Sequence, residues 1–600
     1  GEESTRGFGP ELLEREWYHL VLAYDDEARS LNWVVHPGRE IGSSSNLSGT
    51  MDSGNMRIAG GERLLFSASS ADPALLYNGK IAEPVLIAGA VSSVRHVELR
   101  AANLPSDLAV VAKWDLALHC EGRTMINPVD SRWNMRLVNR PTRGMTGPNW
   151  TGKVDSFTDT PLEYNAIHFH DDDLEDAGWE ISFSVDIPED LPSGIYAARL
   201  KGGAACEYIS FFVTPGANAQ RAPIAFQVPT FSYLAYGNES LDATLLPPGA
   251  FPLACPGADS GRFAYLAHHQ LRSTYDHHND GSGICFASAL RPNLTSLAPD
   301  HRCRLFNGPH QLSADLHLVD WLTEKGFAFD IVTDHCVHFQ GAAALAAYSV
   351  VISGSHPEYH SEATLDGIEN YLDGGGSYMY LGGNGYYWVV ALEPERGMLL
   401  EIRRPHGTRA WSGQPGEGRL SLTGEIAGLW ALRGRPPQKT FGVGMAAQGF
   451  DRGSCYQRTE ASFERPYAAL FEGIDTERFG DIPALVLSHG AAGYEVDRAD
   501  RALGTPPHAV VLATSGRFSD NYQRVVEEVH ATSRFEGGLS CDEVRSDVVI
   551  FETGKGGTVF STGSISWCST LSWNSYDNEV SRLTANVIDH ILAKCPARPG

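Results

Sequence analysis

The pattern of apolar and polar positions changes character near residue 220. Before it, short segments alternate apolar and polar residues, as half-buried strands do. Residues 16–25 and 29–38 are two such segments separated by an acidic turn, and 75–87 is a third. The Ser- and Gly-rich stretch 42–55 predicts a long loop between them. Short strands with polar turns predict a β-sandwich over residues 1–88.

A second sandwich is expected over residues 89–218. The segment 179–203 alternates well, with a Pro-Ser-Gly turn at 192–194, and 207–215 predicts a closing strand. The second module has immunoglobulin-like character, and the first resembles the C-terminal half of a laminin-G or concanavalin-like jelly roll. Because half a jelly roll leaves strand edges unpaired, we expect that N-terminal sequence is missing.

After residue 219 the pattern predicts apolar strands alternating with helices. Residues 311–326 read as a helix with Ser313 as N-cap, and 361–376 as a helix capped by Ser361. Such alternation predicts an α/β domain over 219–600 with a doubly wound, largely parallel sheet. A terminal helix is expected at 581–592, and the predicted strands are 327–332, 348–354, 377–383, 483–490, 508–516, 546–554 and 556–564.

Composition narrows the functional classes. Of 600 residues, 42% are hydrophobic and 20% charged, which is typical of folded domains, and the formal net charge is −26. So acidic a surface repels phosphate backbones and anionic lipids, so neither nucleic acid nor a membrane is an expected partner. The ten cysteines form no CxxC pair, which favours reduced thiols in a cytoplasmic protein.

Ligands of open α/β sheets bind beyond the carboxyl ends of the strands, so strand-end residues are the first candidates. The segment after 348–354 carries His356 and Glu358, the one after 377–383 carries Asn384, and 230–238 carries Tyr233 and Tyr236. If the sheet is wound as predicted, these side chains share one cleft. The alternative is that they cap strands and satisfy backbone groups.

Two further segments hold candidate chemistry. The stretch 272–281 contains Tyr275, His277 and His278. Adjacent histidines rarely point the same way, so a zinc site using both is disfavoured against a polar loop. After strand 483–490, Glu495 is a candidate general base, with an exposed ion pair to Arg498 as the alternative.

Two other groupings are weaker. Cys336 lies between His335 and His338, but sequence neighbours do not have the geometry of a nucleophilic pair, which favours a buried strand-end cysteine. The run 168–173, with two histidines and three aspartates, could bind calcium or zinc, and a solvated turn is the alternative.

Taken together, these segments resemble the large (beta) subunit of N,N-dimethylformamidase and its relatives. The sharpest matches are TFSYLAYGN, TYDHHNDGSG, GSHPEYHS, GGNGYYW and GYEVDR, in this order along the chain. The resemblance implies a glutamine-amidotransferase-like α/β domain without that class's working cysteine.

The resemblance also implies a mononuclear Fe(III) held by Tyr236, Tyr275 and Glu358, with Tyr233 as the alternative to Tyr236. His356, Asn384 and Glu495 would then line the iron pocket. Two phenolates and a carboxylate bring three negative charges and hard oxygen donors, which suit a ferric ion. A site with three protein ligands leaves positions for water and substrate.

The function implied is hydrolysis of N,N-dimethylformamide and similar small N-substituted formamides to formate and an amine. The family's enzyme pairs this large subunit with a small (alpha) subunit, so an α2β2-type hetero-oligomer is expected. The alternatives are a non-catalytic carbohydrate-binding or structural multidomain protein, and the same site acting on a different small amide.

Overall fold

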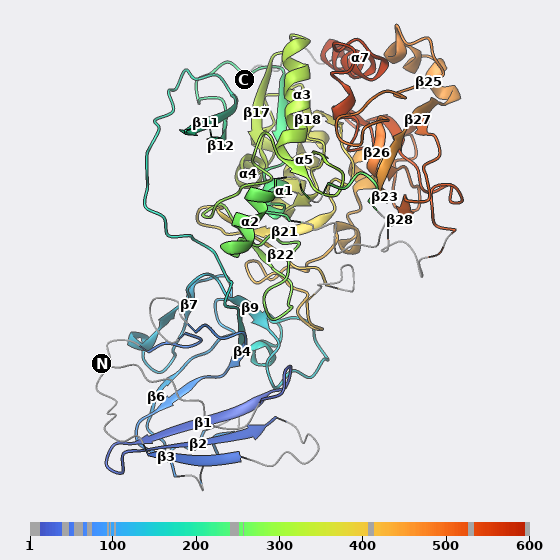
Figure 1. Ribbon diagram of the computed structural model, residues 1–600. Coiled ribbons are helices and arrows are strands. Elements are labelled where there is room, and N and C mark those ends of the chain that lie inside the picture. The colour runs from blue at the N-terminus through green and yellow to red at the C-terminus, as the bar shows by residue number, and fades with distance from the viewer. Residues whose placement is uncertain are drawn as a thin grey trace. The chain divides into compact units, whose positions relative to one another are not determined.

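The computed structural model divides into two compact units. One comprises residues 1–173 and 415–424, and the other 174–414 and 425–600 (Figure 1). The predicted three-way division at 88/89 and 218/219 stays a prediction. The structure describes the whole chain except residues 1–11, 39–46, 53–63, 69–74, 93–94, 96–97, 101–103, 204, 241–250, 256, 258, 406–412, 526–532, 534 and 595–600.

The first unit is built from small antiparallel sheets. Its first sheet joins β1 (Tyr18–Asp25) to β2 (Ser30–Pro37) across the predicted acidic turn, and β2 to β3 (Leu47–Asp52). The prediction of a loop over 42–55 is therefore wrong for 47–52, where backbone pairing to β2 overrides the weak strand propensity of Ser and Gly. The jelly-roll topology stays a prediction.

Further short strand pairs in this unit surround a small core. Trp114 and Ile167 are fully buried in it. The guanidinium of Arg143 donates to several backbone carbonyls, among them Leu116 O at 3.0 Å, and so holds the surrounding loops. The strands are β4 (Gly79–Ala82), β5 (Val85–Ile87), β6 (Val110–Lys113), β7 (Thr124–Met125), β8 (Met135–Arg136), β9 (Thr142–Met145) and β10 (Ala166–Phe169).

The second unit begins with a segment that the alternation pattern describes only in part. A hairpin forms from β11 (Gly194–Gly202) and β12 (Ala205–Val213) after the predicted turn. Residues 179–187, predicted as a strand, form none, and their apolar side chains are exposed. Alternation marks a strand only where a neighbour supplies hydrogen bonds, and 179–187 has no paired strand among the described residues. The immunoglobulin-like sandwich stays a prediction.

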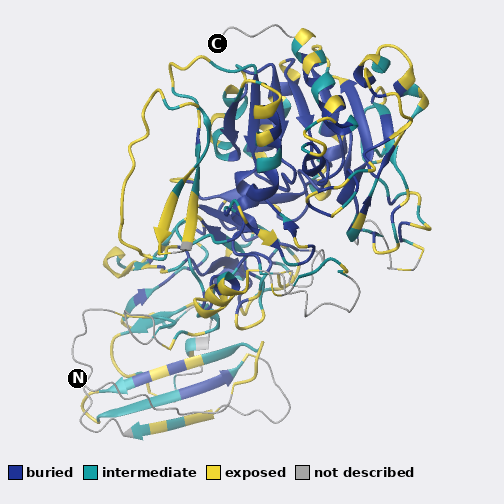
Figure 2. Cartoon of the chain, turned by 45° about the horizontal axis from the view of Figure 1, so that its top comes forward, coloured by how far each residue is buried: buried dark blue, intermediate teal, exposed yellow. Residues whose placement is uncertain are grey.

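The core of the second unit is a nine-stranded mixed sheet, whose parallel strands are mostly dark blue, that is buried, in Figure 2. Five neighbouring strands are parallel, in the order β17 (Phe329–Thr333), β13 (Ile224–Val228), β18 (Val350–Ser353), β20 (Ser377–Tyr380) and β30 (Thr558–Ser561). Their continuous apolar runs suit burial on both faces. The sheet continues antiparallel through β29 (Asp547–Glu552), β27 (Val510–Ser515), β24 (Tyr456–Arg458) and β25 (Arg478–Phe479).

Helices follow the predicted stretches closely. The Ser361 hydroxyl accepts from Thr364 N at 3.2 Å, which confirms the cap of α5 (Glu362–Asp373). Ser313 is not the N-cap of α3 (Leu312–Glu324), because it lies inside the helix and Gln311 is the N-cap. The Ser313 hydroxyl accepts from His310 N. The other helices are α1 (Thr230–Ala235), α2 (Ser260–His268), α4 (Asp334–Gln340), α6 (Pro437–Phe441) and α7 (Glu579–Lys594).

Smaller sheets surround the central one. The prediction of a strand over 483–490 is wrong: these residues form turns, and the strand follows at β26 (Ala492–Arg498). β26 pairs with β23 (Gly444–Ser454), which also pairs with β28 (Gln523–Arg524). The remaining strands are β14 (Phe286–Ser288), β15 (Arg302–Cys303), β16 (Gly308–Pro309), β19 (Tyr359–His360), β21 (Trp388–Leu392) and β22 (Leu399–Ile402).

Short 3-10 helices complete the described elements, and no described helix is long and apolar enough to cross a membrane. The 3-10 segments are Glu98–Arg100, Ser131–Trp133, Pro161–Tyr164, Gly341–Ala344, Trp430–Arg433, Glu460–Phe463, Tyr467–Phe471 and Cys568–Thr570.

Candidate active site

The carboxyl ends of three neighbouring parallel strands bring the predicted residues together. After β13 the chain enters α1, whose C-cap is Tyr236, and after β18 it reaches Glu358. The Ser232 hydroxyl accepts from Glu358 N at 2.9 Å and so ties the two segments. Asn384 follows β20 with φ of 46°, and Asp497 Oδ1 accepts from its backbone N–H at 2.7 Å. The first hydrogen bond ties α1 to the segment after β18, and the second ties the segment after β20 to β26.

Glu358 is the centre of this site. Its side chain is fully buried. Oε2 accepts from the hydroxyls of Tyr236 at 2.7 Å and Tyr275 at 3.2 Å. Oε1 accepts from Asn384 Nδ2 and Trp388 Nε1, both at 3.0 Å. Two phenols and a carboxylate therefore converge on one point.

A second buried carboxylate lies beside the first. Glu495 is 6% exposed, and its Oε2 accepts from Asn384 Nδ2 at 3.0 Å. His356 Nε2 lies 3.0 Å from the same oxygen and 3.4 Å from Glu358 Oε2. The alternative of an exposed pair with Arg498 is wrong, because Glu495 points inward from β26 and Arg498 binds Asp500 at 2.7 Å.

Burial and charge shift the titration of these groups. Burial lowers the pKa of His356, but the charges of Glu495 and Glu358 outweigh it and the net shift is upward. Burial and the charge of Glu358 raise the pKa of Tyr236 well above its usual value. In the protein alone, Tyr236 therefore remains a phenol that donates to Glu358.

Near Tyr275, the candidate site is lined by residues that the sequence did not single out. The Tyr275 and Tyr236 rings stack with centroids 4.5 Å apart, and the Tyr275 hydroxyl contacts that of Tyr359. Arg404 lies over the Tyr275 ring at 4.9 Å and donates to the Tyr359 hydroxyl at 3.0 Å. Tyr359 and Trp388 stood within the matched segments, whereas nothing in the sequence marked Arg404.

Of the two candidate tyrosines in α1 and its cap, Tyr236 meets Glu358. The Tyr233 hydroxyl instead donates to Asp315 Oδ2 at 2.6 Å. Residues three apart on a helix lie on the same face, yet here the two hydroxyls reach different buried carboxylates, Asp315 and Glu358.

The donor set suits a hard cation. The hydroxyls of Tyr236 and Tyr275 both lie within hydrogen-bond distance of Glu358 Oε2, so three oxygen donors are close together. Beside them, Asn384 Oδ1 is buried without a hydrogen-bond partner of good geometry among the described residues. A buried polar atom of this kind normally has a partner, which an ion with bound water would supply.

The remaining sequence candidates lie elsewhere or in other arrangements. His278 is buried and its neighbour His277 exposed, so the two do not share a target. Cys336 lies in the first turn of α4 rather than at a strand end, and its N–H binds the Thr333 hydroxyl at 3.2 Å. Its partial burial does not match the buried cysteine expected.

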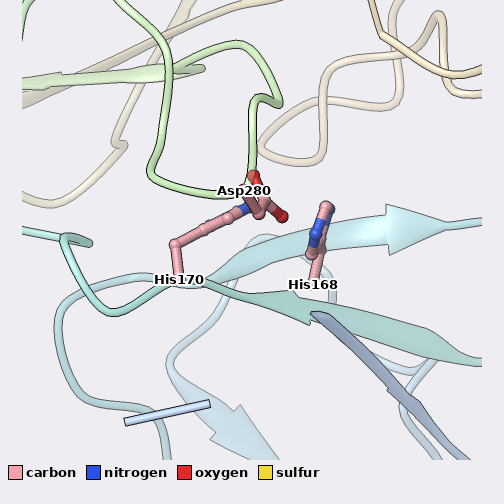
Figure 3. Close-up of side chains that lie close together, drawn as sticks. All are labelled: His168, His170 and Asp280. Atoms are coloured by element: carbon pink, nitrogen blue, oxygen red, sulfur yellow. The ribbon is translucent and has the colours of Figure 1, made fainter. Parts of the chain in front are cut away.

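The run 168–173 is more ordered than a solvated turn. His170 is 6% exposed and its Nδ1 lies 3.1 Å from Asp173 Oδ1. The His168 and His170 rings, labelled in Figure 3, lie with centroids 4.2 Å apart at the end of β10. The solvated-turn alternative is therefore wrong for His170.

Comparison with known proteins places this chain in a family. The family model described as "N,N-dimethylformamidase beta subunit-like, C-terminal" matches residues 142–578. The N,N-dimethylformamidase beta subunit of Alcaligenes sp is 36% identical over 614 aligned residues, covering 98% of this chain and 80% of that protein. That of Paracoccus aminophilus is 39% identical over 531 residues, covering 87% and 69% respectively.

Proposed function

Because the chain belongs to the family of N,N-dimethylformamidase beta subunits, we propose that it is an iron-dependent amidohydrolase of small N-substituted formamides. N,N-dimethylformamide would be cleaved to formate and dimethylamine. The observation that carries the proposal is the convergence of the Tyr236 and Tyr275 hydroxyls on Glu358 Oε2.

We propose that Tyr236, Tyr275 and Glu358 hold a mononuclear Fe(III). Their three charges, once the phenols ionise, would balance a trivalent ion, and hard oxygen donors suit it. When bound, the ion supplies Lewis acidity toward the formyl oxygen or toward a water molecule. Trp388 and Asn384, which donate to Glu358 Oε1, orient that carboxylate so that Oε2 faces the two tyrosines.

Glu495 is our proposed general base. Its carboxylate is buried, and Asn384 and His356 hold Oε2 from two sides at 3.0 Å each. A base fixed in this way is oriented before substrate arrives and accepts the proton of the attacking water. His356, within 3.0 Å of Glu495, is placed to orient the water or to pass the proton on toward the departing amine.

Asn384 is our proposed positioning residue for both carboxylates. Its Nδ2 bridges Glu358 Oε1 and Glu495 Oε2, and so fixes the proposed iron ligand relative to the proposed base. A role as donor to the developing oxyanion also belongs to this proposal, and it requires that one of the two carboxylates give up its N–H.

Two further proposals concern the assembly and the fold. We propose that the chain works with a small alpha subunit in an α2β2-type complex, which the naming of its relatives as beta subunits supports. We also propose that the parallel part of the large sheet is the core of a doubly wound, glutamine-amidotransferase-like domain.

Hydrolysis of N,N-dimethylformamide tests the proposed function. Iron-loaded protein, co-expressed with its small subunit, should release formate and dimethylamine in equal amounts. The Glu358→Ala variant should lose iron and turnover together. Formate release by iron-free protein, or its absence with every small formamide tested, would contradict the proposal.

A further inference from the structure

Three buried side chains with metal-ligating atoms meet outside the set that the proposed reaction uses. Glu239, Cys303 and His310 are 3%, 2% and 5% exposed. One carboxylate oxygen, the thiol sulfur and one imidazole nitrogen all lie within 4.8 Å of one another. We propose that these three residues bind one zinc ion, at a site distinct from the one centred on Glu358.

The backbone holds the three residues in place. Cys303 ends β15 and pairs with Gly308 of β16, and His310 directly follows that strand, so one hairpin supplies two of the ligands. Glu239 comes from a different segment, where its N–H donates to the Tyr236 carbonyl at 3.0 Å. A metal here would join the hairpin to the segment that carries Tyr236.

The distances suit a tetrahedral ion. Glu239 Oε1 lies 3.9 Å from Cys303 Sγ, and Glu239 Oε2 lies 3.4 Å from His310 Nδ1. Zinc bonds of about 2.0 Å to nitrogen or oxygen and about 2.3 Å to sulfur place neighbouring ligand atoms roughly 3.3–3.6 Å apart. The Glu239–His310 pair already has this spacing, and the other ligand atoms, which lie within 4.8 Å of one another, would have to move closer together around the ion.

Polar atoms at the cluster have no other partner of good geometry. His310 Nδ1 is buried without a hydrogen bond, and so is the hydroxyl of Tyr494, whose ring centroid lies 6.4 Å from that of His310. Orphaned buried donors and acceptors are rare in native proteins and indicate a missing ligand or water. The Gln311 side-chain amide lies 3.2 Å from His310 Nε2. With its oxygen turned to the ring it would accept the Nε2 proton and leave Nδ1 free to bind metal.

The surroundings favour a cation as well. Leu305, Phe306 and Leu487 belong to the apolar cluster that contains Cys303, so water is largely excluded. Among the described residues, no Lys or Arg forms an ion pair with Glu239. A carboxylate buried in this way is costly unless a positive charge compensates it, which a divalent ion would do together with a thiolate.

The test uses metal analysis of the full chain, prepared without a histidine tag and loaded with zinc after iron. Wild type should hold one zinc per chain in addition to iron. Cys303→Ser should lose the zinc and keep iron and its visible band. The matched control is Cys568→Ser, since Cys568 is also buried and its thiol donates to a backbone carbonyl, Leu381 O at 3.2 Å.

Zinc retained by Cys303→Ser at the level of Cys568→Ser would overturn the proposal, because the zinc would then occupy another site. A second measurement does not depend on the folding of a variant. Cobalt(II) added to the wild type in place of zinc should give a thiolate-to-cobalt charge-transfer band in the near ultraviolet. Cobalt uptake without that band would equally overturn the site. Neither result depends on whether the protein hydrolyses amides.

Discussion

Replacing Glu495 by Gln tests the role proposed for the second buried carboxylate. The substitution keeps the shape of the side chain but removes the charge and the basic oxygen. Because the Glu358 and Glu495 carboxylates share the Asn384 amide donor, loss of one charge also relieves repulsion between them. We therefore expect a folded protein that still binds iron, since Glu495 is not among the proposed ligands.

The expected loss of turnover follows from what a positioned base contributes. General-base catalysis is worth about 10²–10⁴-fold in rate, or roughly 3–5 kcal/mol at about 1.36 kcal/mol per tenfold. The preorganisation of Glu495 by two partners, each at 3.0 Å, argues for the upper part of this range. Substrate binding does not need the base, so kcat should fall far more than KM changes.

The assay is formate release from N,N-dimethylformamide at saturating substrate, with iron measured on the same samples. Glu393→Gln is the matched control, because Glu393 is also 6% exposed and accepts from two backbone N–H groups, of Glu395 and Arg396. The control should keep wild-type turnover. A Glu495→Gln variant that keeps iron and turns over within tenfold of wild type would refute the assignment of the base.

Three further predictions concern the proposed iron ligands, a buried aspartate and the assembly. Tyr275→Phe should lose iron or shift the visible band, whereas Tyr233→Phe should keep the band because its hydroxyl meets Asp315; absorption spectra of the two variants decide this. Burial raises the pKa of Asp334 to about 7, so the stability given by its protonated form is complete below about pH 3.8 and lost as pH rises through 7. The melting temperature of wild type relative to Asp334→Asn should therefore fall across that window and level off above it; a constant difference would contradict the shift. Co-expression with a small subunit should give a stable complex by size-exclusion chromatography, and a lone, fully active monomer would argue against the assembly.

Much of the candidate site could be predicted from where its residues stand along the chain. Glu358 and Asn384 follow buried apolar strands, and the rule that strand ends meet at one sheet edge brings them together. The structure has this arrangement, with Asn384 Nδ2 at 3.0 Å from Glu358 Oε1. Local signals were equally sufficient for the Ser361 cap of α5.

The wrong predictions and the unpredicted site residue have a common physical origin, which is contact between distant segments. The segment 483–490, expected to be a strand, has apolar residues but pairs with no strand that the structure describes. The strand forms instead at β26, where β23 supplies the hydrogen bonds. Residues 47–52 show the reverse, since β2 makes a strand of a sequence rich in Ser and Gly. Arg404 contacts Tyr275 and Tyr359 only because the fold brings distant segments together, and no local sequence pattern predicts such a contact.

Iron content combined with the visible spectrum tests the central claim most directly. A site of Tyr236, Tyr275 and Glu358 predicts one ferric ion per chain and a phenolate-to-iron charge-transfer band that Tyr275→Phe removes or shifts. The amide-hydrolysing activity should rise and fall with that band as iron is removed and restored. A colourless, iron-free preparation with full activity would contradict the account.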